Sequence, residues 1–185
     1  IYMTLYKALM DQNKTEDARA VLEEALKLGG SKGQDLVNQG NIYLKLGEYA
    51  SAEEKFKKAL DKGEVSAHLG YAELYRTEEK RNYPEAEAHF EAYLAQVTDD
   101  AEAYNKYGSF LMDQENYTKA EEIYTRGVAL NNRLLDRTIS KNQISAAEHA
   151  GNWAKALEYM NVYLQKYSDD AEAVREKAFI QTRIR

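Results

Sequence analysis

The sequence predicts an all-α protein: a row of stacked antiparallel helix pairs, about five repeats followed by a final helix. Three observations predict this class: a repeat of about 34 residues, apolar residues at helical spacing, and a single proline, Pro84, in the whole chain. So little proline favours helices, because folds of sheets and loops need more turn residues. With 44% hydrophobic and 30% charged residues, the chain can also bury a sizeable core.

The repeat is clearest at an alanine that recurs at equal steps along the chain. A large side chain follows each alanine after four positions, and a further packing residue follows after three more. Equal steps along three parallel tracks indicate a true internal repeat. A fifth copy is displaced by two positions, which predicts a longer connection before it. The tracks comprise Ala18, Ala52, Ala86 and Ala120; Leu22, Phe56, Phe90 and Tyr124; Ala25, Ala59, Tyr93 and Gly127; and, in the fifth copy, Ala156, Met160 and Tyr163.

Each unit shows helical spacing twice, with a short break between the two stretches. In the second unit Gly40 and Tyr43 share one face of a first helix, and Ala52 and Phe56 share one face of a second. The break at 47–48 has the length expected between antiparallel helices. Small residues allow the helices to approach closely, and the aromatic rings fill the space between units.

Helix pairs of this length cannot bury their apolar faces alone, so neighbouring pairs must stack into one continuous array. We therefore expect a single array over residues 1–185. The expected units are 1–32, 33–64, 65–98, 99–132 and 133–168, with a final helix at 169–185.

Polar residues and glycines mark the expected helix ends. Capping-box spacing places helix starts at Asn82, Asp99 and Asp169, each followed three positions later by glutamate. Ser31 is expected to cap the helix after the first turn, and helices should stop at Gly29-Gly30, Gly63 and Gly151. The final helix, about 170–184, is expected to leave three apolar side chains uncovered. These are Val174, Ala178 and Ile180.

Composition and spacing exclude several functional classes. A net charge of −6 argues against nucleic-acid binding, and no apolar run is long enough to insert into a membrane. The chain has no cysteine, and its three histidines never recur at helical metal-binding spacing. His68 lies on a packing track, and His89 and His149 are expected to be exposed. We therefore expect no enzyme activity, no cofactor and no metal, and the compartment stays open.

The repeated residues resemble the tetratricopeptide repeat, whose pattern is W-x₂-L-G-x₂-Y followed by A-x₃-F over about 34 residues. Gly40, Tyr43, Ala52 and Phe56 match this pattern, and Leu36 occupies the tryptophan position. The proline at the end of each family unit is missing throughout. The resemblance covers essentially the whole chain, and it implies a right-handed superhelix whose concave groove is lined by the first helix of each pair.

The resemblance further implies a non-catalytic protein–protein interaction module that holds a partner peptide or helix in this groove. Asn41 and Asn105 stand out because an amide side chain can both donate to and accept from a peptide backbone. The plainer interpretation is that they are ordinary solvated residues. The full set of expected groove residues is Lys7, Met10, Asn38, Asn41, Lys45, Glu73, Arg76, Asn105, Lys106, Ser109, Met112, Lys141, Asn142 and Ser145.

Two other functions stay open on the sequence alone. The chain could be a structural component that self-associates or stacks into a larger assembly through its repeat ends, or a regulatory part of a longer catalytic protein. Some family members grip a partner's terminal carboxylate with lysines and asparagines on three successive first helices. Here Glu102 stands at the position of one such lysine, which argues against that mode of binding.

Overall fold

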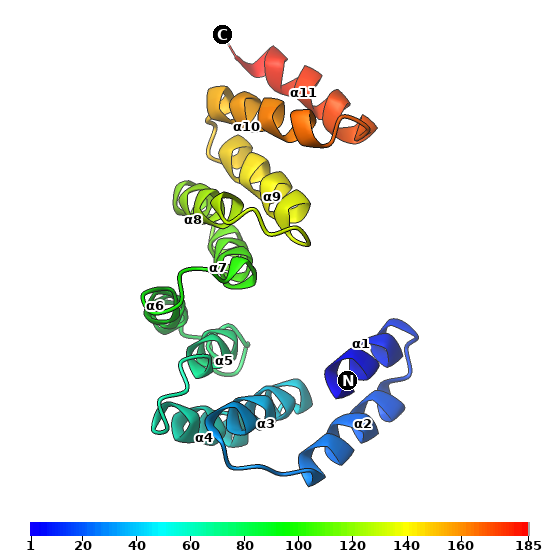
Figure 1. Cartoon of the computed structure of the whole chain (residues 1–185), viewed down its shortest axis with the longest axis vertical. Coiled ribbons are helices and arrows are strands. Elements are labelled where there is room, and N and C mark those ends of the chain that lie inside the picture. The colour runs from blue at the N-terminus through cyan, green and yellow to red at the C-terminus, as the bar shows by residue number, and fades with distance from the viewer. Residues whose placement is uncertain (185) are drawn as a thin grey trace. The chain divides into compact units, whose positions relative to one another are not determined.

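The computed structural model describes residues 1–184 and contains eleven α-helices and no strand in that range (Figure 1). The predicted all-α class is thereby confirmed. The helices are α1 (Tyr2–Asp11), α2 (Thr15–Lys27), α3 (Gly33–Leu46), α4 (Tyr49–Leu60), α5 (Ala67–Leu74), α6 (Tyr83–Leu94), α7 (Ala101–Asp113), α8 (Tyr117–Ala129), α9 (Asp136–His149), α10 (Trp153–Lys166) and α11 (Ala171–Arg183).

The helices form two compact units, of which the first ends at Gln96 and the second begins at Val97. The first unit contains the antiparallel pairs α1–α2, α3–α4 and α5–α6. The second unit contains the pairs α7–α8 and α9–α10, and α11 packs on α10. Within each unit the second helix of a pair also contacts the first helix of the next pair, as in α4 with α5 and α8 with α9. Stacked helix pairs thus bury apolar clusters between neighbouring helices, such as the cluster shared by α3, α4 and α5 and the cluster shared by α10 and α11.

The alanine track forms the centre of these cores. Ala18, Ala52, Ala86 and Ala120 are completely buried. The large residue four positions later is buried in every copy, and in the fifth copy Ala156 is buried in the same way. The packing tracks predicted from the repeat period are therefore confirmed.

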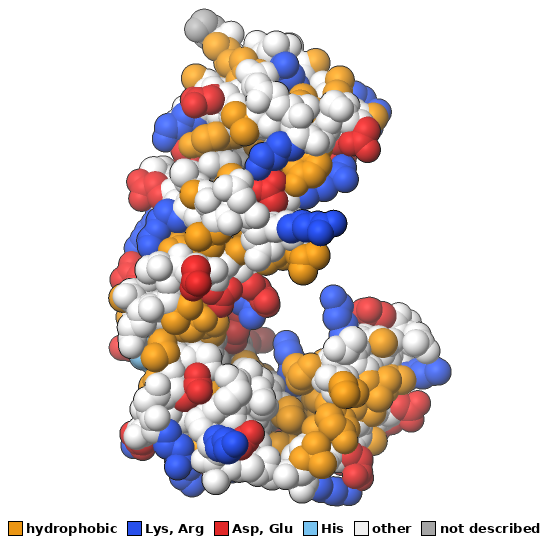
Figure 2. All heavy atoms as spheres, viewed as in Figure 1, with side chains coloured by type: hydrophobic (Ala, Val, Ile, Leu, Met, Phe, Trp, Pro, Cys, Tyr) orange, Lys and Arg blue, Asp and Glu red, His pale blue; other side chains and the backbone are white. Residues whose placement is uncertain are grey.

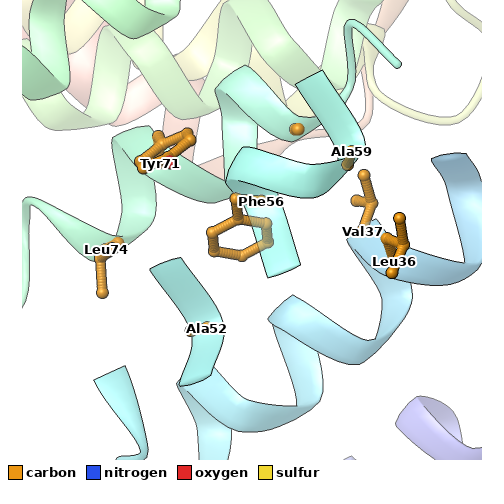
Figure 3. Close-up of a cluster of buried hydrophobic side chains, with 8 residues drawn as sticks. Leu36, Val37, Ala52, Phe56, Ala59, Tyr71 and Leu74 are labelled. Carbon is orange, nitrogen blue, oxygen red and sulfur yellow. The ribbon is translucent and has the colours of Figure 1, made fainter. Parts of the chain in front are cut away.

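Close approach between helices is achieved at a glycine that faces an aromatic ring. Phe56 on α4 is completely buried between α3 and α5 (Figure 3). A Cβ added to Gly40 on α3 would lie 2.4 Å from the Phe56 ring, and one added to Gly70 on α5 would lie 2.3 Å from it. Tyr71 tilts against the same ring at a centroid distance of 5.6 Å. One phenyl ring therefore fixes the spacing of three helices.

Helix starts differ from the prediction by one position in three places. Asn82 caps α6 as predicted, by accepting a hydrogen bond from the backbone N–H of Glu85. The predicted caps Asp99 and Asp169 are wrong. The caps are the next residues, Asp100 and Asp170, because α7 and α11 begin one position later than the capping-box spacing indicated.

The cap predicted at Ser31 is also wrong. Lys32 is the residue that precedes α3, and its backbone N–H donates to the carboxylate of Asp35 at 3.1 Å. The predicted stops hold better. Gly63 and Gly151 follow the ends of α4 and α9 with φ angles of +75° and +73°, a left-handed conformation that glycine adopts without strain.

The last helix is covered more fully than the sequence indicated. Val174 and Ala178 are exposed, as expected, but Ile180 is completely buried. It packs into a cluster with Met160 and Tyr163 of α10. The prediction that Ile180 would be uncovered is wrong, because α11 packs on α10 through its buried residues Ala173 and Ile180.

Candidate partner-binding face

The first unit carries the predicted groove residues of the first three pairs, on α1, on α3 and at the end of α5. Some of them make local contacts: Asn38 accepts from Gln34 at 3.2 Å, and Arg76 pairs with Glu73 at 3.3 Å. We call this set the first-unit face. Its members are Lys7, Met10, Asn38 and Lys45, which are exposed, and Asn41, Glu73 and Arg76, which are half-buried.

In the second unit the predicted residues lie on α7 and α9, and two of them meet. The Asn142 side-chain amide donates to Oδ1 of Asn105 at 2.9 Å, across the two first helices of neighbouring pairs. The sequence pattern singled out both residues but did not predict that they touch. We call this set the second-unit face. Its members, all half-buried, are Asn105, Lys106, Ser109, Met112, Lys141, Asn142 and Ser145.

The amide pair keeps hydrogen-bonding capacity after its own bond is made. An amide has two N–H donors and two acceptor positions on its oxygen. The bond uses one donor of Asn142 and one acceptor position of Asn105. A donor on Asn105 and the oxygen of Asn142 can then serve a peptide backbone, which presents both group types at almost every residue.

The lysines of the second-unit face are held in ion pairs. Lys106 lies 3.2 Å from Glu102, one turn earlier on α7. Lys141 lies 2.9 Å from Asp170 and 3.6 Å from Glu172, and the hydrogen bond to Asp170 raises the pKa of Lys141. The face is therefore polar and mixed in charge, without a strong excess of either sign.

Buried carboxylates hold the helices of the second unit, and the sequence reasoning missed them. Asp170 accepts hydrogen bonds from Tyr163 at 2.6 Å and from Arg137 at 2.9 Å, and it pairs with Lys141. Tyr163, Arg137 and Lys141 hold the pKa of Asp170 well below its usual range. This carboxylate also caps α11, so it ties that helix to both α9 and α10.

Two further carboxylates repeat the arrangement. Glu121 on α8 binds Lys155 at 2.7 Å and Tyr159 at 2.8 Å, both on α10. Asp136 at the start of α9 accepts from Tyr167 at 2.8 Å and pairs with Lys166. The sequence separation of Glu121 and Lys155 equals the repeat period, so the period itself was a signal that could have identified this pair.

A buried carboxyl oxygen lies near the second-unit face. Glu148 is on α9, and its Oε1 is buried without a hydrogen-bond partner among the described residues. Burial, together with the neighbouring carboxylate of Glu176 on α11, raises the pKa of Glu148 to about 7. At neutral pH this site is therefore poised between its protonated and ionised forms.

Stability of the second unit should depend on pH through Glu148. Its folded pKa lies above the ordinary value of 4.5, so the favourable contribution is complete below pH 4.5 and is lost as pH rises through about 7. After allowance for solvent screening, we expect the free energy of unfolding to fall by about 1 kcal/mol from pH 5 to pH 8. The substitution Glu148→Gln should flatten this dependence and leave the unit more stable than wild type at pH 8.

Denaturant unfolding followed by the fluorescence of Trp153, the single tryptophan, reports on this unit. The matched control is Glu158→Gln, which removes an exposed carboxylate from α10 and should retain the wild-type slope. An equal pH slope in Glu148→Gln and wild type would refute the assignment.

One of the three histidines, His89, is placed differently from the prediction. The expectation that His89 is exposed is wrong: Nδ1 of His68 lies 2.8 Å from Nδ1 of His89, and both side chains are half-buried. The two residues belong to different helices, α5 and α6, so no single-helix spacing reveals the contact. His149 is exposed, as predicted, and contacts Ser145.

Among residues 1–184, no group of three histidine, cysteine, aspartate or glutamate side chains could hold a metal ion. Over the same residues, no helix has the length and apolar character that a membrane span requires.

Comparison with known proteins agrees with the repeat pattern. Residues 4–67 and 37–98 match the model of a family described as the tetratricopeptide repeat, and together these matches cover more than half of the 185 residues. The chain belongs to the tetratricopeptide repeat (TPR) family. A later part of this TPR chain, residues 103–184, matches a family described as the EMC2 TPR-like repeat domain.

A curated relative of this TPR chain is the ETO1-like protein 2 of Arabidopsis thaliana. The two are 34% identical over 110 residues, a match that covers 56% of this chain. The chain spans only 12% of the length of that relative.

Solved structures share the TPR fold at low sequence identity. MamA has a TM-score of 0.61 at 20% identity, with 92% of each chain covered. TTC0263, a TPR protein of Thermus thermophilus, has a TM-score of 0.62 at 18% identity, with 98% of this chain and 97% of its own chain covered. YrrB, described as a TPR protein with an unusual peptide-binding site, has a TM-score of 0.58 at 21% identity, with 96% and 90% covered. These likenesses show the fold.

Proposed function

We propose that this chain is a non-catalytic interaction module that binds a peptide or helix of a partner protein along the first helices of its pairs. TPR repeats are in general protein-interaction modules, and the chain belongs to that family. The proposal adds the location: the first-unit face on α1, α3 and α5, and the second-unit face on α7 and α9.

The observation that carries this proposal is the amide pair of Asn105 and Asn142. Asparagine has a low intrinsic helix propensity. Two asparagines at facing positions on α7 and α9 therefore reduce helix stability more than polar residues of higher propensity would. Their mutual bond at 2.9 Å holds both side chains in one orientation. A preordered donor and acceptor reduce the entropy that is lost when a peptide binds.

The side chains around the pair fit an extended peptide. Lys106 and Lys141 are half-buried and neutralised by neighbouring carboxylates, so they offer hydrogen-bond donors without a strong net field. Met112 adds an adaptable apolar surface two turns beyond Asn105 on α7. The partner segment that suits this face is therefore uncharged or mixed in charge, with an apolar side chain that can contact Met112.

The groups that an enzyme would need are engaged in other contacts. His68 and His89 bind each other, and His149 bonds to Ser145. The buried carboxylates Asp170 and Glu121 bind lysine, arginine and tyrosine side chains that link helices. These contacts support a scaffold whose charged groups stabilise the fold.

Partner capture on the immobilised chain tests the proposed face. We expect Asn142→Glu to weaken binding of a captured partner at least about tenfold, about 1.4 kcal/mol, because a carboxylate cannot donate to Asn105 and repels peptide carbonyls. The matched control is Asn161→Glu, the same substitution at an exposed position of α10. Both variants are first compared with wild type by circular dichroism.

Captured proteins would be identified by mass spectrometry, and binding of each would be measured with purified components. A partner that binds wild type and Asn161→Glu but loses affinity for Asn142→Glu supports the proposed face. Equal affinity for all three proteins places the binding surface elsewhere and refutes the proposal.

A further inference from the structure

The two helices of the third pair are joined by a contact between imidazole rings. His68 lies on α5 and His89 on α6, and their Nδ1 atoms are 2.8 Å apart, which is a hydrogen-bond distance. The ring centroids are 5.1 Å apart and both rings are half-buried. The contact therefore links α5 to α6 within the packed first unit.

Aromatic neighbours fix the position of this contact. The His89 ring stacks on Tyr71 at 4.7 Å with an interplanar angle of 7°, and lies 5.7 Å from the Tyr75 ring. The Tyr71 hydroxyl donates to the backbone carbonyl of Glu53 on α4 at 3.2 Å. A movement of His89 would therefore displace the Tyr71 ring on α5 and, through the Tyr71 hydroxyl, disturb the hydrogen bond to α4.

The hydrogen bond between the two imidazoles limits how many additional protons the pair can bind. In a bond between two Nδ1 atoms, one nitrogen carries the hydrogen and the other offers its lone pair. A first additional proton can bind at the outer nitrogen of the donor ring and leave this bond intact. A second additional proton must occupy the lone pair of the acceptor, which places two N–H groups and two positive charges face to face. The contact then has to open.

One nearby carboxylate acts on the charge of the pair. Glu85, one turn before His89 on α6, favours the charged form of His89. Glu53 on α4 is already paired with Lys80 at 2.8 Å. The charged residues of α3 are Asp35 and Lys45, and they lie near the two ends of α3. Burial lowers the pKa of both imidazoles, and the proximity of His68 lowers that of His89 further.

We propose that the His68–His89 contact is an acid-sensitive joint, which holds α5 against α6 at neutral pH and releases them when both imidazoles are protonated. The joint itself does not depend on the proposed binding function. Its consequence for binding does: Glu73 on α5 and Arg76 just beyond its end belong to the first-unit face, so opening the joint would loosen that part of the face.

The direction of the pH effect follows from the lowered pKa values. The stabilisation is complete above the ordinary histidine pKa of 6.5 and is lost as pH falls below it, because the unfolded chain then binds protons that the folded pair resists. The two protons leave a coupled pair in two macroscopic steps.

Amide hydrogen exchange at pH 7.5 and pH 5.5, corrected for intrinsic rates, tests the joint. In wild type, the protection of α5 and α6 amides should fall about tenfold between the two pH values. His89→Gln cannot gain this charge, so its protection should change less than about twofold. His149→Gln, which removes the exposed histidine of α9, is the matched control and should behave as wild type.

An unchanged protection in wild type, or the same fall in His89→Gln as in wild type, would overturn the proposal. If His89→Gln does not fold, the ring-proton resonances of His68 and His89 decide the question in the wild-type chain. Two coupled titration steps, the later one displaced to low pH, support the joint. Independent titration of both rings near pH 6.5 contradicts it.

Discussion

Replacing Phe56 by alanine is expected to destabilise the first unit by about 3–5 kcal/mol, which is the cost of deleting a fully buried phenyl ring. The cost should lie in the upper part of this range, because the cavity cannot collapse easily. Gly40 and Gly70 already bring the backbones of α3 and α5 to the two sides of the ring, and neither has a side chain that could move into the space. Figure 3 shows the ring at the centre of the cluster formed by α3, α4 and α5.

The measurement is denaturant unfolding, with amide exchange of α3 to α5 as the local reporter. Phe179→Ala on α11 is the matched control, because Phe179 is 53% exposed and its truncation leaves no closed cavity. We expect that control to cost less than about 1 kcal/mol. Similar losses for the two substitutions would show that Phe56 is not the residue that spaces the three helices.

Replacing Glu121 by alanine is expected to destabilise the second unit by about 2–3 kcal/mol. Glu121 is buried, and its carboxylate receives hydrogen bonds from Lys155 at 2.7 Å and Tyr159 at 2.8 Å. Hydrogen bonds to a charged group contribute more than neutral ones, and removal of one member of a buried ion pair leaves its partners unsatisfied. Lys155 is half-exposed and can return to water, so the loss stays below that of a fully enclosed pair.

The adjacent residue supplies the control for this prediction. Glu122→Ala removes the same side chain from an exposed position on the same helix, and surface substitutions of this kind change stability by less than about 0.5 kcal/mol. Unfolding of both variants is followed by Trp153 fluorescence. A cost for Glu122→Ala as large as that for Glu121→Ala would mean that burial of the carboxylate is not what matters.

The packing of the fold was predictable because the same packing positions recur in every repeat. Ala52 alone is an ordinary alanine, but its recurrence at equal steps marks a position where only a small side chain fits. The structure buries each copy completely. Helix starts were less predictable, because Asp99-Asp100 and Asp169-Asp170 each offer two adjacent capping residues and local spacing cannot choose between them.

Contacts between different helices were the part that sequence patterns did not reveal. His68 and His89 meet only when α5 packs on α6, and the two residues lie on either side of the connection at 75–82. Glu121 appears in the sequence as one more charged residue of a helix surface, yet it is buried under α10. Asn105 and Asn142 were both expected on the binding face, but their mutual bond depends on the relative positions of α7 and α9.

Hydrophobic side chains also gather on the surface of the α1–α2 pair, as Figure 2 shows. Tyr2, Met3, Leu5 and Met10 of α1 are among the exposed large hydrophobic residues of the chain. Lys7, a proposed member of the first-unit face, lies on the same helix. A partner bound to the first-unit face would therefore also contact the exposed apolar side chains of α1.

The central claim is that a partner binds along the first helices of the pairs, and amide exchange with and without a captured partner peptide tests it most directly. The account predicts slower exchange in α7 and α9, centred on Asn105 and Asn142, and unchanged exchange on the exposed surfaces of α8 and α10. Protection confined to α8 and α10, with α7 and α9 unaffected, would contradict the account.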